Sequence, residues 1–388
     1  MKWPKQSLGD MITGEVEKKR IPGMILGITT NGKEDHICVG NAVIDAKKPV
    51  EADTIFRIFS MSKPVCAVAI HILMERGLIL QDDLLSDYIP AFTNMEKWEG
   101  NQVVPEEKPI RISHLLSMTA GMTYDDGDNP GWRTGLLIAS IHDHMDRNEP
   151  FTTQMVAEAL ANQPLASTPG ERWRYGFCAD VLGAVIEKVS KKRLGDFYRD
   201  EIFEPLHMVD TGFYVPEEKK DRFAVLYKRT QKDGRYCLEE DVEHHLGLGD
   251  YGRRPDFESA GAGLVSTYQD YMRFVQMLAG GGILDGVRIL GEETVRSFTR
   301  NQMTEEQTQG IYFEHMKGYG YGNLMRVRLE DTPAEVPGTA SSFGWDGWCG
   351  PYMAVDMLHN SGILMFTQLS AYADWDTNTS ILRHLLSV

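Results

Sequence analysis

The strand-like segments of this 388-residue chain lie at its two ends, and helical patterns fill the middle. Near the N-terminus, the apolar runs 24–30 and 37–39 flank Asn31-Gly32, a dipeptide typical of the tight turn of a β-hairpin. The last third of the chain returns to strand-like runs, at 318–327, 352–357 and 363–369. This distribution predicts an α+β fold, in which both termini build one antiparallel sheet flanked by helices and the middle forms an inserted, mostly helical lobe.

The inserted segment divides the chain into two lobes. We expect residues 1–75 and 255–388 to form a discontinuous α/β lobe that carries the sheet. Residues 76–254 are expected to form the mostly helical lobe, with irregular polar loops at 91–110 and 123–150. Because clefts between lobes are preferred ligand sites, the active site is expected in the cleft between these two lobes.

The composition excludes several classes of partner. The net charge is −16, so a nucleic acid, which requires a basic surface, is not an expected partner. No apolar run approaches the roughly 20 residues of a membrane-spanning helix, and the N-terminal segment lacks the apolar stretch of a signal peptide. The five cysteines form no CxxC pair and are expected to be reduced thiols. We therefore expect a cytoplasmic protein that acts on a small molecule, away from membranes.

The first candidate for chemistry is an S-x-x-K pattern formed by Ser60 and Lys63, where a strand-like run gives way to a helical one. Residues at i and i+3 share one face of a helix, so the serine hydroxyl and the lysine amine can meet. A serine hydroxyl needs a base to become a nucleophile, and burial can lower the pKa of a lysine that assists it. The pattern alone carries little weight, because roughly one match is expected by chance in such a chain.

Several further segments follow in a recognisable order. The run at 54–64, which contains the S-x-x-K pattern, resembles the first motif of class C β-lactamases and of the esterases related to them. The other segments that resemble this family, in the family's order, are 115–122, 168–175, 259–267 and 343–348. The resemblance spans about residues 10–380 and implies a serine hydrolase of the β-lactamase and penicillin-binding-protein type.

The resemblance implies a role for each matching residue. Ser60 would be the acylated nucleophile and Lys63 its hydrogen-bonded neighbour. Tyr175 would take the Ser60 proton and pass it to the leaving group, although either Tyr175 or Lys63 could be the base. The backbone N–H groups of Ser60 and Trp348 would form the oxyanion hole. The third-motif residues expected at the edge of the cleft are Trp345, Asp346 and Gly347.

Two motifs depart from the β-lactamase pattern. Residues 175–177 read Tyr-Gly-Phe where β-lactamases have Y-x-N, and residues 345–347 read Trp-Asp-Gly where they have K-T-G. The lost amide and lysine would have met the side-chain amide and the carboxylate of a β-lactam, and Asp346 would repel that carboxylate if it faced the cleft. Esters or amides with apolar parts are therefore the expected substrates. The aromatic residues expected to line an acyl pocket, besides those of the third motif, are Phe177, Tyr124 and Trp132.

Together these features predict a serine hydrolase that acts on an ester or amide through a Ser60 acyl-enzyme, as a carboxylesterase with little β-lactamase activity. An acyltransferase, in which an alcohol or amine replaces water, shares the same features, and so does a D-amino-acid amidase or peptidase. The alternative from another class is a non-catalytic binding protein that retains the fold, against which the intact Ser60, Lys63 and Tyr175 argue. No HExxH pattern or closed ligand set is present, so neither a metal nor a cofactor is expected.

Overall fold

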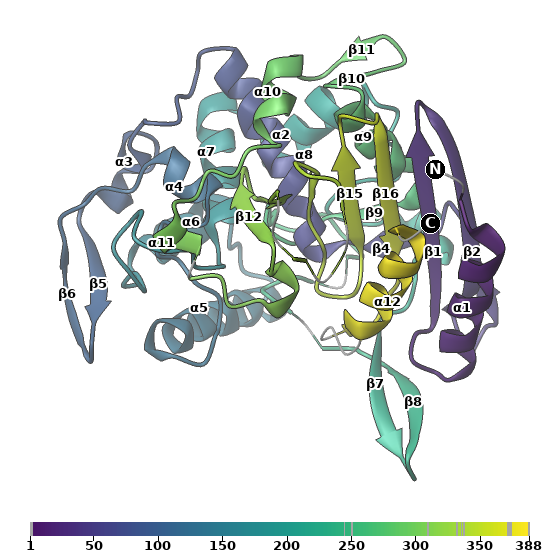
Figure 1. Cartoon of the computed structure of the whole chain (residues 1–388). Coiled ribbons are helices and arrows are strands. Elements are labelled where there is room, and N and C mark those ends of the chain that lie inside the picture. Colours follow the sequence, from purple (N-terminus) through teal and green to yellow (C-terminus); the bar gives the residue numbers. More distant parts are fainter. Residues whose placement is uncertain are drawn as a thin grey trace.

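The computed structural model describes residues 3–386 except 244, 250, 309, 331–332, 335, 337 and 371–374. Figure 1 shows a large antiparallel sheet with helices on both of its faces, and beside it a second region that is mostly helical. The predicted α+β class, of the β-lactamase and transpeptidase type, is confirmed. No helix within the described ranges combines the length and the hydrophobicity needed to cross a bilayer.

Both ends of the chain build the large sheet, as predicted. In the described residues it has eight strands in the order β12-β13-β14-β15-β16-β1-β2-β3. The N-terminal strands are β1 (Gly23–Thr30), β2 (Lys33–Val43) and β3 (Lys48–Pro49). The C-terminal strands are β12 (Tyr319–Gly322), β13 (Met325–Arg328), β14 (Phe343–Gly344), β15 (Tyr352–Asp356) and β16 (Ser361–Phe366). The two ends join where β1 pairs with β16, with Ile25 opposite Phe366.

Side chains alternate across the sheet, so each face has its own core. On one face, helices α1 (Lys5–Glu17) and α12 (Trp375–Leu386) cover a cluster that includes Met24 and Leu26 (Figure 1). On the other face, α9 (Tyr268–Ala279) packs on β15 and β16, and Ile25 and Phe366 belong to the larger core. This larger core continues into the helical region, so the sheet and the helices around the candidate site are packed as one body.

The helical region and its connections contain the remaining elements. The helices are α2 (Ser62–Glu75), α3 (Leu85–Tyr88), α4 (Ile112–Leu116), α5 (Asn129–Asp146), α6 (Thr153–Ala161), α7 (Cys178–Ser190), α8 (Leu194–Tyr198), α10 (Glu292–Ser297) and α11 (Glu305–Thr308). The two-stranded pairs are β4 (Ile55–Arg57) with β9 (Val265–Thr267), β5 (Met95–Glu99) with β6 (Gln102–Glu106), β7 (Tyr227–Lys232) with β8 (Arg235–Glu240), and β10 (Ile283–Leu284) with β11 (Val287–Arg288).

Two segments that were predicted to be irregular loops are ordered elements, so those predictions were wrong. The segment 91–110 contains the β5–β6 hairpin, and Leu165, far along the chain, adds backbone hydrogen bonds to β5. The segment 123–150 contains α5, whose N-cap Asp128 accepts a hydrogen bond from Gly131 N–H. An Asp or Asn at the N-cap accepts from the free N–H groups of a helix, and a Pro in the first turn has no N–H to leave unpaired, but the same residue types are common in loops. Their presence at 128–130 marked a helix N-terminus.

Candidate active site

Ser60 lies in a tight turn between a strand and a helix. After β4, residues Phe59–Met61 form a short 3₁₀ turn that leads directly into α2. Phe59 adopts a left-handed backbone with φ of 42°, a conformation that costs a residue with a side chain about 1–2 kcal/mol. The buried Phe59 ring, whose centroid is 5.2 Å from that of Trp348, holds this conformation. Ser60 is 8% exposed at the start of α2, where helix N–H groups favour developing negative charge.

Lys63 occupies a fully buried position one helical turn after Ser60. Its Nζ donates to Ser60 Oγ at 3.1 Å, to the Gly261 carbonyl at 2.9 Å and to the Tyr124 hydroxyl at 3.2 Å. Burial lowers the pKa of Lys63 to about 8, although the negative charge of Asp180 partly opposes this shift. A lysine with this pKa is neutral in roughly a tenth of molecules at pH 7, and a proton acceptor must be neutral.

Tyr175 lies next to Ser60 and Lys63. The Lys63 Nζ is 4.6 Å from the centroid of the Tyr175 ring, and the Trp345 indole N–H donates to the Tyr175 hydroxyl at 3.1 Å. Burial raises the pKa of Tyr175 above its ordinary value, while hydrogen bonds with Ser60 and Trp345 act in the opposite direction. Tyr175 is therefore a neutral phenol near pH 7. Of the two candidate bases, Lys63 is the one whose pKa lies near the working range.

Asp180, on α7, completes the surroundings of Lys63 and was missed by the sequence analysis. It is 2% exposed, and its Oδ1 accepts from Ser259 Oγ at 2.5 Å and from Gly261 N–H at 3.1 Å. The carbonyl of the same glycine accepts from Lys63, so Asp180 holds the segment that holds the lysine. Burial raises the pKa of Asp180 above its ordinary value, while the hydrogen bond from Ser259 and the positive charge of Lys63 oppose this shift. A single carboxylate in the otherwise apolar run 178–186 was the signal that could have revealed it.

The structure places the charge of Asp346 in an ion pair. The Asp346 carboxylate accepts from Arg326 Nη1 at 2.6 Å, and both side chains are buried. Arg326 lies on β13, the neighbouring strand to β14, and the sequence analysis did not single it out. Asp346 therefore anchors the third motif to the sheet, and its charge is matched inside the protein. Trp345, beside it, is buried and points its indole N–H at Tyr175.

Gly347 brings the third motif directly beside the turn that carries Ser60. A Cβ atom at Gly347 would lie 2.3 Å from the Ile58 carbonyl oxygen, so only glycine permits this approach. The next residue, Trp348, is half-buried, and its ring contacts those of Phe59 and His245 at 5.2 and 4.3 Å. Among the described residues, the Trp348 N–H donates to no backbone carbonyl. This N–H group thus lies on the segment next to the Ser60 turn without a partner in the backbone.

The three aromatic residues predicted to line an acyl pocket lie in different environments. Tyr124 is half-buried beside Lys63, and its ring contacts those of Tyr175 and Phe177 at 5.5 and 4.7 Å. Phe177 is 1% exposed and belongs to the core. Trp132, on α5, is 62% exposed, and no hydrogen bond or ring contact joins it to these residues in the part of the chain described. The structure therefore brings Tyr124 and Phe177 to Tyr175, and leaves Trp132 on the surface.

The fold is the one shared by the serine hydrolases and acyl transferases related to β-lactamases. The family model described as Beta-lactamase matches residues 8–385, and the chain belongs to this family of enzymes. Protein Rv1367c of Mycobacterium tuberculosis (strain ATCC 25618 / H37Rv) is 30% identical over 330 residues, which cover 82% of this chain and 78% of the relative.

Two further similarities concern named enzymes. Esterase EstB of Burkholderia gladioli is 28% identical over 342 residues, which cover 84% of this chain and 81% of that protein. The solved structure of EstCE1, described as a hydrolase with promiscuous acyltransferase activity, superposes with a TM-score of 0.78 at 24% identity. It covers 98% of this chain and 99% of its own, and at this identity it supports the fold alone.

Proposed function

We propose that this enzyme hydrolyses carboxylic esters through an acyl-enzyme on Ser60 and has little activity on β-lactams. The observation that carries the proposal is the hydrogen bond between Lys63 Nζ and Ser60 Oγ in a buried site that lowers the pKa of the lysine to about 8. A neutral amine in contact with a serine hydroxyl can remove its proton during attack. The similarity to an esterase over most of both chains supports the choice of ester substrates.

The contacts suggest a route for the proton. Neutral Lys63 accepts the Ser60 proton while Oγ bonds to the ester carbonyl carbon, and the resulting oxyanion receives hydrogen bonds from the N–H groups of Ser60 and Trp348. When the carbon–oxygen bond to the alcohol breaks, the proton returns from Lys63 to the leaving oxygen through Tyr175, whose ring centroid is 4.6 Å from the Lys63 Nζ. Water then attacks the acyl-enzyme by the reverse route, and the acid is released.

The third motif supports a preference for uncharged substrates. Its Trp345 is uncharged, and the charge of Asp346 is matched by Arg326. A β-lactam carboxylate would lose part of its hydration next to these residues and find no cation in the motif to compensate. The half-buried rings of Tyr124 and Tyr175, beside Lys63, offer apolar area to the acyl or alcohol group instead.

Labelling with a serine-reactive phosphonate tests the proposal. We expect one adduct, located on Ser60 by mass spectrometry, and loss of p-nitrophenyl butyrate hydrolysis in proportion to labelling. Ser60→Ala should remove both and retain the fold. The neighbouring Ser62 is a built-in control, because its buried Oγ accepts a hydrogen bond from Leu264 N–H and serves the structure. An adduct on Ser62, or full activity in Ser60→Ala, would refute the proposal.

Transfer of the acyl group to an alcohol or amine would use the same residues, and it is the second candidate because EstCE1 is described as having promiscuous acyltransferase activity. Adding an alcohol to the ester assay separates the two functions, since a transferase forms a new ester at the expense of free acid. A panel that also contains D-amino-acid amides and a chromogenic cephalosporin separates esterase from amidase and from β-lactamase activity.

A further inference from the structure

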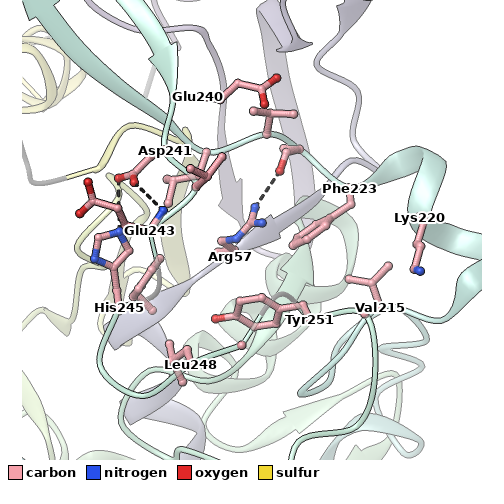
Figure 2. Close-up of a pocket in the computed structure, with 17 residues that line it drawn as sticks. Arg57, Val215, Lys220, Phe223, Glu240, Asp241, Glu243, His245, Leu248 and Tyr251 are labelled. Atoms are coloured by element: carbon pink, nitrogen blue, oxygen red, sulfur yellow. Dashed lines mark hydrogen bonds and ion pairs between the residues drawn. The ribbon is translucent and has the colours of Figure 1, made fainter. Parts of the chain in front are cut away.

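A pocket that is distinct from the proposed catalytic site lies next to the Ser60 turn. It has a volume of about 480 Å³ and is lined by the end of β4 together with residues 215, 220, 223–226, 240–243, 245, 248–249 and 251–252 (Figure 2). Its lining includes Arg57 and also Phe59, which is bonded directly to Ser60. Within the described structure, Ser60, Lys63 and Tyr175 are not part of this lining. The pocket is therefore separate from the proposed catalytic residues.

Aromatic rings form the wall between the two sites. His245 lines the pocket, and its ring centroid is 4.3 Å from that of Trp348, the residue whose N–H is proposed for the oxyanion hole. Phe59 lines the pocket as well and contacts the same tryptophan. A ligand in this pocket would thus contact the far side of the residues that shape the Ser60 site.

The strongest sign of a ligand is the hydroxyl of Tyr251. This side chain is 7% exposed, lines the pocket, and has no hydrogen-bond partner for its hydroxyl among the described residues. Figure 2 shows the hydroxyl directed towards the His245 and Leu248 side of the pocket. A buried hydroxyl left without a partner destabilises the fold, and most buried polar atoms in proteins are paired. A ligand oxygen would supply the partner.

The charge around Tyr251 favours an anionic oxygen. The Arg57 guanidinium lies beside the rings of Phe223 and Tyr251, at 4.0 and 5.5 Å from their centroids. One of its N–H groups donates to the Ala224 carbonyl at 2.8 Å. A guanidinium carries five N–H donors and is weakly hydrated, so it readily recognises a carboxylate in a partly buried place.

Two of the acidic residues of the lining, Asp241 and Glu243, have partners of their own. Asp241 accepts from the Glu243 N–H and is 3.3 Å from His245 Nε2. The Glu243 carboxylate is 3.5 Å from Lys228 and is exposed, and Glu240 is exposed as well. Charges in water at the rim act weakly on a ligand held at the buried end. The buried end is defined by Tyr251 and Arg57.

We propose that this pocket is a binding site for a small organic carboxylate with an apolar body. The carboxylate would accept from the Tyr251 hydroxyl next to the Arg57 guanidinium. The hydrocarbon part would lie against apolar side chains that line the pocket, which include Val215, Leu226 and Leu248. The site does not depend on the proposed esterase activity, because none of the catalytic residues lines it.

Calorimetric titration with hexanoate tests the site, using protein whose Ser60 has first been blocked by the phosphonate. We expect hexanoate to bind the blocked and unblocked proteins alike, and hexanol to bind more weakly. Tyr251→Phe should weaken hexanoate binding by at least about tenfold, since it removes one hydrogen bond to a charged group. Its melting temperature should not fall, because the hydroxyl has no partner within the described protein. Tyr214→Phe, at a 39% exposed tyrosine, is the matched control and should bind normally.

Leu248→Trp provides a second variant that fills the pocket, and it should abolish hexanoate binding while the protein stays folded. The proposal is overturned if hexanoate gives no binding heat at millimolar concentrations, or if Tyr251→Phe binds as tightly as the unmodified protein. Loss of binding on blocking Ser60 would also overturn it, because the carboxylate would then occupy the catalytic site. If the phosphonate fails to label Ser60, the esterase proposal is refuted. The carboxylate-site proposal is still tested by comparing hexanoate binding among the unlabelled protein and its variants.

Discussion

A lysine ammonium has three N–H donors, and Lys63 has three acceptors placed around it. They are the Ser60 hydroxyl, the Gly261 carbonyl and the Tyr124 hydroxyl. All three are uncharged, so the ammonium is held in place while burial still lowers its pKa to about 8. An arginine would keep its charge in the same place, because its pKa is too high for burial to neutralise it. The site thus suits a residue that must be positioned when charged and react when neutral.

Asp180→Asn is expected to move the pH profile of ester hydrolysis to lower pH. The Asp180 charge favours protonated Lys63, so its removal lowers the pKa of Lys63 further. Lys63 acts as a base only when neutral, so kcat/KM falls as the pH drops through this pKa, which is about 8 before the substitution. The acid limb of kcat/KM for p-nitrophenyl butyrate measures the change. Asp285→Asn, at an exposed carboxylate, is the matched control. An acid limb that stays in place would contradict the role of Asp180.

Lys63→Ala and Tyr175→Phe are each expected to lower kcat by several orders of magnitude. The two side chains share one proton route through Ser60, so removing either one interrupts it. The double variant should therefore be little worse than either single variant, as is found for groups that act as a unit. Steady-state kinetics with p-nitrophenyl butyrate give the comparison. Losses that add would show that the two residues do not cooperate, and nearly full activity in Tyr175→Phe would remove the tyrosine from the route.

The segment that carries the third motif depends on contacts between elements. Its Gly347 N–H donates to the Pro351 carbonyl, and Asp346 is tied to Arg326 on β13. These contacts hold the segment against the Ser60 turn, where Gly347 meets the Ile58 carbonyl. The place of the Trp348 N–H is thus set by the packing of one segment against another.

Gly347→Ala is expected to lower kcat on the order of a hundredfold, which is the effect of losing one oxyanion donor. The added Cβ would lie 2.3 Å from the Ile58 carbonyl oxygen and would push the third motif away from Ser60. Kinetics with p-nitrophenyl butyrate test this, with thermal unfolding measured in parallel to show that the variant is folded. Gly14→Ala, in α1 with no atom within 4 Å of the added Cβ, is the control and should keep full activity. Unchanged kcat in Gly347→Ala would rule out an oxyanion role for this segment.

The fold of the whole molecule decides which charges reach a substrate. The third motif arrives from the C-terminal part of the sheet without a lysine, and its aspartate is neutralised by the sheet's own Arg326. The side chains nearest to the Ser60 hydroxyl are therefore Lys63, Tyr175 and the aromatic rings around them. Under the proposed function, we expect such surroundings to favour an uncharged ester over an anionic β-lactam.

We expect kcat/KM for p-nitrophenyl butyrate to exceed that for a chromogenic cephalosporin by at least about a hundredfold, or roughly 2.7 kcal/mol in transition-state binding. The cephalosporin carboxylate would be partly desolvated without a cation from the third motif. Steady-state assays of both substrates on one protein preparation make the comparison. A higher kcat/KM for the cephalosporin would mean that another part of the site recognises the carboxylate.

Local sequence patterns were enough to predict several elements of this structure. The Asn31-Gly32 hairpin and the helix that follows Ser60 were predicted and are confirmed, because turn chemistry and helical periodicity act between near neighbours. The contact of Lys63 with Ser60 is of the same kind, since it joins residues three apart on one helical turn. The origin of the sheet in both termini also followed from where the strand-like runs lie along the chain.

Only the tertiary structure decided what surrounds that pair. The Lys63 contact with Gly261 spans 198 positions, and the link from Asp180 to Gly261 spans 81. The pairing of Arg326 with Asp346, which neutralises the charge of the third motif, joins β13 to the segment after β14 and spans 20 positions. Spacing along a chain does not reveal which distant side chains will be buried together. The sequence therefore determined which residues could react, and the packing of distant segments determined their charges, their partners and their pKa values.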